Sequence, residues 1–383
     1  MDKPTVQDIF HRFYPAYLDQ YSPSPVQAKV AHNIMNCKTG AYGANVCVCE
    51  DCGFVQIHYN SCRNRCCPMC QAVPKEMWMD ARREDVLDAP YFHLVFTVPD
   101  ILNPVIYSNQ RLLYDALYHA ASSTISELTA DPKHLGAKVG YICILHTWGS
   151  EMNFHPHIHT ILLGGGLASN NQWKDNGENF FLPIRVISKV FREKYLEELK
   201  RLWAEDKLVF HGTAEKFRNH YTFKELLDSC YGMDWIPHCK KTFNGAQTVI
   251  KYLGKYTHRI AVSNHRIVRM DDDTVTFLVK DYRNEGQWKE LTISGVEFVR
   301  RFLMHVPPRR FVRIRHYGLL CSRTKSQKLT LCRNLLGCKK YLSKLRDMEM
   351  PEILEHLYGI KVCVCKACGG HLGKPQMRMP LRC

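Results

Sequence analysis

The sequence HPHIHTILLGGG at residues 155–166 is the stretch on which the fold of this chain depends. Its three histidines stand at alternate positions and lead into an apolar segment rich in strand-forming residues, which we expect to end at the three glycines. Because side chains along a strand alternate between two faces, a strand here would place all three imidazoles on one face. Imidazole is the commonest side-chain metal ligand. The stretch therefore predicts a strand that carries a metal site.

A second strand is expected just before the histidine strand, at residues 140–147. If the short connection between the two strands is a hairpin, His146 falls opposite His157. Three ligands, His146, His157 and His159, would then converge from two adjacent strands. His155 stands at the strand entrance before a proline, so we treat it as a reserve ligand.

Composition indicates a globular, basic protein. The chain has 383 residues, of which 45% are hydrophobic, enough for an ordinary packed core and for two or three domains. Its 52 Lys and Arg residues outnumber 37 Asp and Glu, and the resulting charge of +15 points to an anionic partner such as nucleic acid, although a well-solvated basic surface is the simpler alternative. The absence of a long apolar run or a signal-peptide pattern leads us to expect a cytoplasmic protein without a membrane partner.

The cysteines predict bound zinc. Eighteen cysteines without a secretion signal favour metal ligation over a disulfide framework. Cys49 and Cys52 form one Cys-x-x-Cys pair, and Cys67 and Cys70 form another about fifteen residues later, a spacing typical of four thiolates around one structural Zn²⁺. The module around this zinc is either a clip that stabilises the fold or a part that helps to grip DNA with the neighbouring Arg63, Arg65 and Lys75.

For the other cysteines, spacing alone leaves the partners open. The remaining thiols of the N-terminal module are either a second zinc site or simply buried: Cys37, Cys47, Cys62 and Cys66. Near the C-terminus, Cys363, Cys365 and Cys368 make half of a metal-binding motif. Spacing does not identify the other half, for which the candidates are Cys332, Cys338, His371 and Cys383.

A pair of tyrosines follows the histidine strand. Tyr252 and Tyr256 are four residues apart, so on a helix they would share one face, with Lys255 and Arg259 beside them. Such a pair is more often packing than chemistry. Beside a metal site, however, a tyrosine hydroxyl can attack a phosphodiester, because the cation draws charge from the phosphate and holds it in line. The product would be a 5′-phosphotyrosine and a free 3′-hydroxyl.

A basic strand is expected at residues 307–317. Alternation would place Arg313, Arg315 and Tyr317 on one face, a combination suited to phosphate contacts and base stacking on single-stranded DNA. The candidate DNA contacts of this region also include Arg309 and Arg310. The alternative is a solvated edge strand whose charges prevent aggregation.

Several motifs, taken together and in order, resemble the two-tyrosine HUH rolling-circle transposases of bacterial insertion sequences. HUH denotes two histidines separated by a bulky apolar residue. The resemblance spans roughly residues 30–340, which makes it far more specific than any single motif. The motifs are YNSCRNR at 59–65, CPMCQ at 67–71, FHPHIH at 154–159, GGGL at 164–167 and YLGKYTHR at 252–259.

The resemblance implies an α+β fold with an HUH endonuclease core, in which helices pack on an RRM-like antiparallel sheet. A Cys-rich zinc-binding module would precede this core and a basic β-rich region would follow it. The implied division is an N-terminal helix at 1–30, a zinc-binding domain at 31–85, the two-tyrosine nuclease core at 86–265, a basic DNA-binding region at 266–345 and a Cys-rich tail at 346–383.

The resemblance also implies a function. Such an enzyme cleaves and rejoins single-stranded DNA at element ends, with catalytic Mg²⁺ or Mn²⁺ and structural Zn²⁺. His146 stands where the family has a polar metal ligand. Tyr256 would make the first cleavage and Tyr252 the second strand transfer. This chain departs from its relatives at Cys66, where they usually have histidine, so a second zinc site would be remodelled with Cys66 and Cys47, or absent.

Two other functions fit part of the sequence. The alternating histidines also fit the histidine-triad nucleotide hydrolases, in which a histidine attacks a phosphate without metal. Those domains are small and need neither the tyrosine pair nor the zinc motifs. A non-catalytic, zinc-dependent DNA-binding protein derived from a decayed transposase is the second alternative, although this chain has every catalytic residue type that the mechanism requires.

Overall fold

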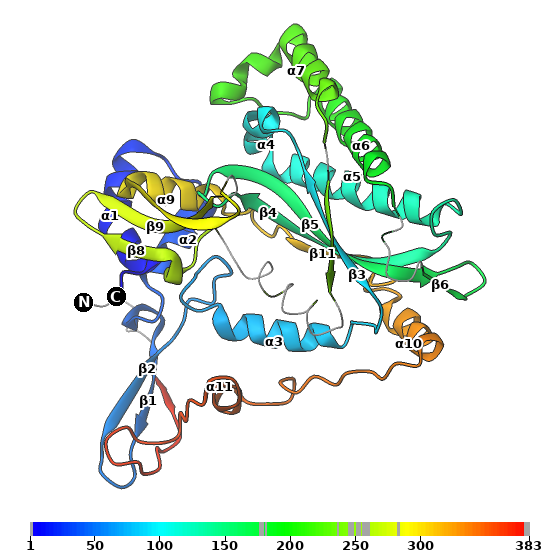
Figure 1. Cartoon of the computed structure of the whole chain (residues 1–383). Helices are drawn as coiled ribbons and strands as arrows, with labels where there is room; N and C mark the ends of the chain where they lie inside the picture. Colours follow the sequence, from blue (N-terminus) through cyan, green and yellow to red (C-terminus); the bar gives the residue numbers. More distant parts are fainter. Residues whose placement is uncertain are drawn as a thin grey trace.

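A six-stranded antiparallel sheet forms the centre of the structure, which is a computed structural model (Figure 1). It describes residues 3–175, 180, 182–235, 237–243, 249, 254, 261–281 and 284–378. The strands are β3 (Tyr91–Thr97), β4 (Lys138–Trp148), β5 (Phe154–Leu167), β6 (Trp173–Asp175), β7 (His238–Phe243) and β11 (Ile314–Gly318). Their order is β11-β4-β5-β3-β7, and β6 pairs with the end of β5.

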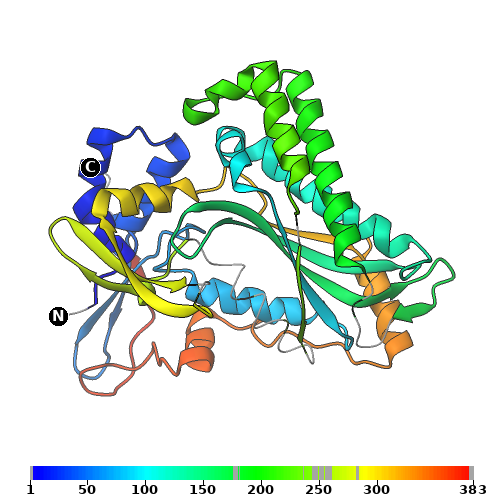
Figure 2. The ribbon, with the colours of Figure 1, turned by 45° about the horizontal axis from the view of Figure 1, so that its top comes forward.

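Helices cover both faces of this sheet (Figures 1 and 2). One face carries apolar side chains at alternate positions, such as Phe92, Leu94 and Phe96 of β3, in a large core with residues from the helices above it. Those helices are α4 (Asn103–Ser108), α5 (Gln110–Ala130), α6 (Ile184–Ala204) and α7 (His220–Gly232). The opposite face packs against α3 (Ala72–Arg83) and α10 (Lys325–Leu336). Short 3₁₀ turns occur at η2 (Asp100–Leu102) and η3 (Gly212–Arg218).

A second core joins distant parts of the chain. The N-terminal helices α1 (Val6–Gln20) and α2 (Pro25–Met35) share it with a three-stranded sheet and α9 (Gly295–Met304). That sheet consists of β8 (Ile267–Met270), β9 (Thr274–Asp281) and β10 (Gln287–Ser294), preceded by the 3₁₀ turn η4 (Asn264–Arg266). Met152, from the connection between β4 and β5, is fully buried in this core. The second core therefore contacts the tip of the histidine hairpin.

A third, small sheet joins a hairpin from the N-terminal part of the chain to a strand from the C-terminal part. β1 (Ala44–Val48) and β2 (Val55–Tyr59) form a hairpin after the 3₁₀ turn η1 (Gly40–Tyr42), and β12 (Gln376–Arg378) pairs antiparallel with β1. The chain reaches β12 through α11 (Met350–Tyr358). Figure 1 shows the hairpin and the C-terminal segment side by side, away from the central sheet.

The predicted fold class is confirmed: helices pack on an antiparallel sheet, and a Cys-rich module lies on its N-terminal side. The hydrophobic cores do not coincide with the predicted domains, however. Residues of β8 to α9 share a core with α1 and α2, whereas β11, from the same predicted segment, pairs with β4. The domain limits themselves stay a prediction. Among the described helices, none has the length and apolar character needed to cross a bilayer.

The histidine strand does not stop at the glycines, as the sequence had suggested, but continues through them to Leu167. The glycines instead allow close approach of neighbouring chain segments. A Cβ atom on Gly166 would lie 2.4 Å from the backbone oxygen of Lys138, and one on Gly165 would lie 2.4 Å from the ring of Trp173. Both contacts are sterically forbidden, so side chains here would push β4 or β6 away from β5.

Gly166→Ala is therefore expected to destabilise the protein by about 1–3 kcal/mol, because the obstructing atom belongs to the backbone and cannot rotate away. Urea unfolding followed by circular dichroism measures this. Gly232→Ala is the matched control, because a Cβ there meets nothing within 4 Å. Equal stability of the two variants would contradict the packing argument.

Candidate active site and metal centres

Three histidines converge on the sheet face that looks toward α3. In the register of β4 and β5, His146 pairs with His157, so the predicted hairpin pairing is confirmed. The nitrogen atoms of His146, His157 and His159 that are available as ligands all lie within 4.8 Å of one another. Three neutral imidazoles so arranged fit a divalent cation. That they bind one stays a proposal.

Hydrogen bonds orient two of these rings. His157 Nδ1 lies 2.7 Å from the carbonyl oxygen of His155, to which it can only donate. His159 Nδ1 lies 2.9 Å from His93 Nε2. The two Nε2 atoms are left facing each other at 3.1 Å. Ligand imidazoles typically hold their second nitrogen in this way, which fixes the ring and the tautomer.

Burial keeps these imidazoles neutral. It lowers the pKa of His157 to about 4, with a smaller contribution from the neighbouring His155. Burial also lowers the pKa of His159 well below its usual value, and His146 adds to this effect. Since only the neutral ring offers a lone pair to a metal, the site is ready to bind a cation without first losing protons.

His155 does not join the cluster, although strict alternation would have placed it on the same face. The pairing of β4 and β5 shifts by one residue between His146 and Trp148, opposite the segment that contains Pro156. A proline cannot donate to the ladder and is common at such irregularities. His155 Nδ1 instead lies 3.1 Å from a carboxylate oxygen of Asp100.

His93 is a site residue that the sequence argument missed. It lies on β3, and its ring stacks at 5.1 Å on that of His159. The signal in the sequence was weak, because a single histidine in an apolar strand has no distinguishing pattern. Only the pairing of β3 with β5, which sets Val95 opposite His159, brings His93 to this cluster.

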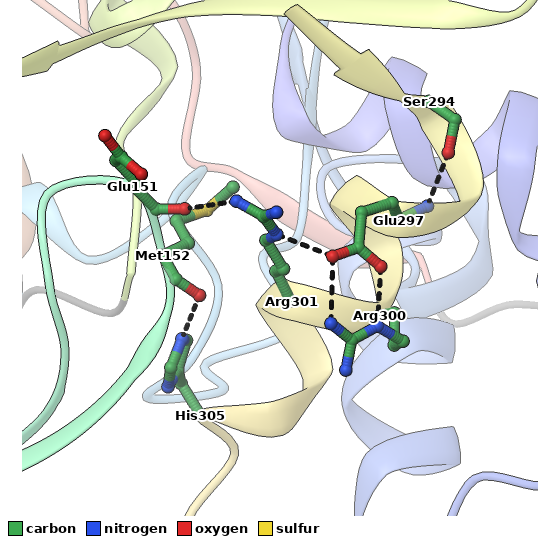
Figure 3. Close-up of polar contacts among 7 residues, drawn as sticks. All are labelled: Glu151, Met152, Ser294, Glu297, Arg300, Arg301 and His305. Carbon is green, nitrogen blue, oxygen red and sulfur yellow. Dashed lines mark hydrogen bonds and ion pairs between the residues drawn. The ribbon is translucent and has the colours of Figure 1, made fainter. Parts of the chain in front are cut away.

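Helix α9 holds the turn of the histidine hairpin (Figure 3). Arg301 donates to the backbone oxygen of Glu151 at 2.9 Å, and His305 Nε2 donates to that of Met152 at 3.0 Å. Glu297 accepts from Arg301 at 2.7 Å and also pairs with Arg300. Met152 needs this support, since its φ of 58° is unusual for a residue other than glycine.

A cavity of about 840 Å³ opens in front of the histidines. Four cationic side chains contribute to its lining, from Arg65, Lys75, Arg266 and Lys280. Trp288, which is 52% exposed, also lines it, and Lys280 lies 5.4 Å from the centre of its ring. Positive charge beside an exposed aromatic ring suits a nucleic-acid strand.

The predicted nucleophiles, Tyr252 and Tyr256, lie outside the described residues, as do Lys255 and Arg259. Gly254, which stands between the two tyrosines in the sequence, is described. It is buried and lines the same cavity as the histidines. A Cβ atom there would collide with the sulfur of Met79 on α3.

The basic strand differs from the prediction. β11 begins only at Ile314, and the face expected to contact DNA is packed. Arg313 is buried over the ring of Trp148, and Arg315 pairs with Asp115 of α5. Tyr317 stacks on Tyr141 at 5.2 Å. The physical reason is that β11 pairs with β4, which brings Arg315 to Asp115 of α5 and Tyr317 to Tyr141 of β4, whereas Arg313, just before the strand, packs on Trp148 of β4.

The other two predicted DNA contacts on this segment are accessible to solvent. Arg309 and Arg310 are exposed, just before β11. Their role as DNA contacts stays a prediction.

The cysteines form two tetrads whose composition differs from the prediction. Cys67 and Cys70 meet Cys37 and Cys62, and the four sulfur atoms lie within 4.8 Å of one another. Cys62 and Cys70 are 3.8 Å apart, close to the roughly 3.8 Å between ligands of a tetrahedral zinc with Zn–S bonds of about 2.3 Å. These residues therefore fit a structural zinc.

Cys49 and Cys52 are absent from this tetrad, so the predicted grouping with Cys67 and Cys70 is wrong. They lie in the turn of the β1–β2 hairpin, whereas Cys37 and Cys62 flank its base. A five-residue strand spans roughly 17 Å, which separates the two ends. Cys49 and Cys52 instead meet Cys365 and Cys368. Neither Cys49 nor Cys52 was among the partners predicted for the C-terminal cysteines.

The two remaining candidate zinc ligands lie outside both tetrads. Cys66 is buried beside Arg65 and Arg313, and burial raises the pKa of its thiol to about 11. Cys47 is buried in a small apolar cluster with Leu372. A second zinc site that uses Cys66 and Cys47 in place of histidines, one of the two predicted outcomes, is therefore not formed by the described residues.

Two family models match the chain. One is described as "Putative transposase" and covers residues 140–328, and the other is the "Transposase zinc-binding domain" at residues 9–98. A relative from Sinorhizobium fredii, named as a transposase, is 40% identical over 95% of this chain and 93% of its own length. The chain belongs to this family of transposases. The transposase for insertion sequence element IS801 of Pseudomonas savastanoi is 30% identical over 79% of this chain and 72% of the relative.

Solved structures give a weaker likeness. A copper-bound structure of the conjugative relaxase TrwC in complex with oriT DNA matches 67% of this chain and 96% of the relaxase at 13% identity, with a TM-score of 0.26. A metal-bound structure of the same relaxase with DNA matches 43% of this chain and 69% of the relaxase at a TM-score of 0.25. Such scores are too low to add to the family assignment.

The burial of His305 makes stability sensitive to acid. Burial lowers the pKa of His305 to about 4, whereas the unfolded side chain titrates near 6.5. As the pH falls from about 6.5 to about 4, only the unfolded state takes up this proton, so stability is lost across that window, by up to about 3 kcal/mol.

His305→Gln should lose less stability on acidification than the wild type, because glutamine has no proton to gain and can still donate to Met152. Urea unfolding at a series of pH values measures the difference. His211→Gln, at an exposed histidine, is the matched control and should keep the pH dependence of the wild type. Identical pH dependence of His305→Gln and wild type would contradict the assignment.

Proposed function

We propose that this transposase cleaves and rejoins single-stranded DNA at the ends of its insertion sequence through 5′-phosphotyrosine intermediates, by a rolling-circle type of transposition. One observation carries the proposal. The cluster of His146, His157 and His159 opens into a cation-lined cavity that is also lined by Gly254, the residue midway between Tyr252 and Tyr256. Because Gly254 lies between the two tyrosines in the sequence, its position in this cavity supports the proposal.

The three histidines would hold a divalent cation, Mg²⁺ or Mn²⁺. When bound, such a cation supplies charge neutralisation at the non-bridging oxygens of the phosphate. His93 orients the ring of His159 through its Nδ1 atom, and the carbonyl of His155 orients the ring of His157 in the same way. Because burial holds His157 neutral, this arrangement persists across the physiological pH range.

The cationic side chains would draw the DNA backbone into the cavity. Arg65 is positioned by a 2.6 Å hydrogen bond to the carbonyl of Phe311, and Arg266 by one of the same length to that of Ser150. Lys280 and Trp288 lie together at the opening of this region. An exposed indole offers a stacking surface for an unpaired base, which favours a single strand over a duplex.

The chemical step is a transesterification. The Tyr256 hydroxyl loses its proton and attacks the phosphorus, a new P–O bond forms to the tyrosine, and the bond to the 3′ oxygen breaks. The released 3′ oxygen takes up a proton. Tyr252 performs the same step on a second strand, and attack by a 3′-hydroxyl on a phosphotyrosine reverses it. The bond energy is retained in the adduct, so rejoining requires no ATP.

The expected outcome with wild-type protein, Mg²⁺ or Mn²⁺ and a single-stranded oligonucleotide from the element end is a covalent protein–DNA adduct. Tyr252→Phe combined with Tyr256→Phe should abolish it, because no hydroxyl remains to attack. Denaturing electrophoresis of labelled DNA measures the adduct. Tyr221→Phe, in an exposed tyrosine on α7, is the control and should leave the yield unchanged.

His157→Ala tests the metal half of the mechanism. It should reduce adduct formation by more than the roughly 10–100-fold that loss of a residue orienting a metal ligand typically costs, while DNA binding and zinc content stay close to wild type. An undiminished adduct in either variant contradicts the mechanism. DNA binding without any adduct would favour a non-catalytic protein, and metal-free hydrolysis of nucleotides would favour a histidine-triad enzyme.

A further inference from the structure

We propose that Cys49, Cys52, Cys365 and Cys368 bind a second Zn²⁺, which closes a zinc ribbon assembled from the β1–β2 hairpin and the C-terminal tail. This site is distinct from the tetrad of Cys37, Cys62, Cys67 and Cys70. Half of it lies in the C-terminal tail, well beyond the family's zinc-binding domain at residues 9–98. The inference is independent of the DNA chemistry.

The sulfur atoms have the spacing of a tetrahedral metal site. All four lie within 4.8 Å of one another. Across the two chain segments, Cys49 and Cys368 are 3.6 Å apart and Cys52 and Cys365 are 3.8 Å apart. Ligands of a tetrahedral zinc are about 3.8 Å apart, whereas a disulfide would need about 2.05 Å. The separations therefore fit a shared cation.

The two halves of the site repeat the same backbone geometry. Each has the sequence Cys-x-x-Cys-Gly, and in each the glycine N–H donates to the carbonyl of the first cysteine at 3.0 Å. Gly53 and Gly369 have φ values of 71° and 76°, which explains why glycine follows each pair. Two copies of one turn that face each other are what a zinc ribbon requires.

Backbone donors also point at the sulfur atoms. The Ala367 N–H donates to Cys365 Sγ and the Gly370 N–H to Cys368 Sγ, both at 3.4 Å. Donors of this kind favour the thiolate, which is the form that binds zinc.

The strands around the site join the C-terminal tail to the N-terminal hairpin. Beyond the pairing of β12 with β1, Cys49 forms a bridge with Leu372, and the Gly373 N–H donates to the carbonyl of Val48 at 2.9 Å. The tail thus forms a third strand beside the β1–β2 hairpin. Chain segments more than 300 residues apart in sequence form one small sheet.

The ribbon has little else to stabilise it. Among the described residues, its apolar core consists of four buried side chains, three of them cysteines: Cys47, Cys49, Cys365 and Leu372. Apolar side chains on its strands are largely exposed, including Val55 and Ile57. Modules with so small a core usually depend on a metal or a disulfide, so zinc at this site would hold the C-terminal tail in place.

Zinc stoichiometry of the purified full chain, measured by mass spectrometry of the metal, tests the proposal. Wild type should hold two zinc ions per chain. Cys365→Ser should hold one, and Cys365→Ser combined with Cys62→Ser should hold none. Cys363→Ser is the matched control, because Cys363 is an exposed thiol two residues away that lies outside the tetrad, and it should retain both ions.

Thiol alkylation of the wild type keeps the test decisive if Cys365→Ser fails to fold. With zinc present, Cys49, Cys52, Cys365 and Cys368 should resist the reagent as a set, and a chelator should make all four reactive. Cys363 should react throughout. One zinc per wild-type chain, two in Cys365→Ser, an equal loss in Cys363→Ser, or reactive Cys365 and Cys368 in the zinc-loaded protein would each overturn the proposal.

Discussion

The pairing of β4 with β5 is the interaction on which the rest of the structure depends. Its register sets His146 opposite His157, and the alternation of the two strands then decides what each face of the sheet can do. One face carries Tyr141, Leu145 and Ile158 into the large core beneath α5 and α6. The other carries the histidines. A slip of one residue would exchange these faces, burying imidazoles among apolar helices, so the core and the site specify the same register.

Helix α3 connects the tetrad of Cys37, Cys62, Cys67 and Cys70 with the cavity in which we propose the DNA chemistry. This helix begins at Ala72, just after the zinc-site residue Cys70, and lies across from the histidine face of the sheet. Cys67, Gln71 and Lys75 all contribute to the lining of the cavity. The tetrad around Cys70 therefore does more than stabilise an N-terminal module. It fixes where α3 starts and, with it, one wall of the cavity in which we place the reaction.

Local periodicity predicted the elements that form the site, whereas distant partners could not be read from the sequence. Alternation and hairpin geometry were sufficient to bring His146 to His157, because the two strands are adjacent in the chain. Spacing groups Cys49 and Cys52 with the next Cys-x-x-Cys pair, Cys67 and Cys70, although their partners in the structure lie more than 300 residues away. Nothing in the sequence of residues 307–317 indicates that Arg313 packs on Trp148 of β4 or that Arg315 pairs with Asp115 of α5, so alternation alone predicts a free basic face.

The central claim is that the β4–β5 hairpin builds a divalent cation site. Crystals soaked in Mn²⁺ and measured at the manganese absorption edge test it most directly. The account predicts an anomalous peak in contact with the imidazoles of His146, His157 and His159, which disappears in His157→Ala. Manganese bound elsewhere, with no peak at these three histidines, would contradict it.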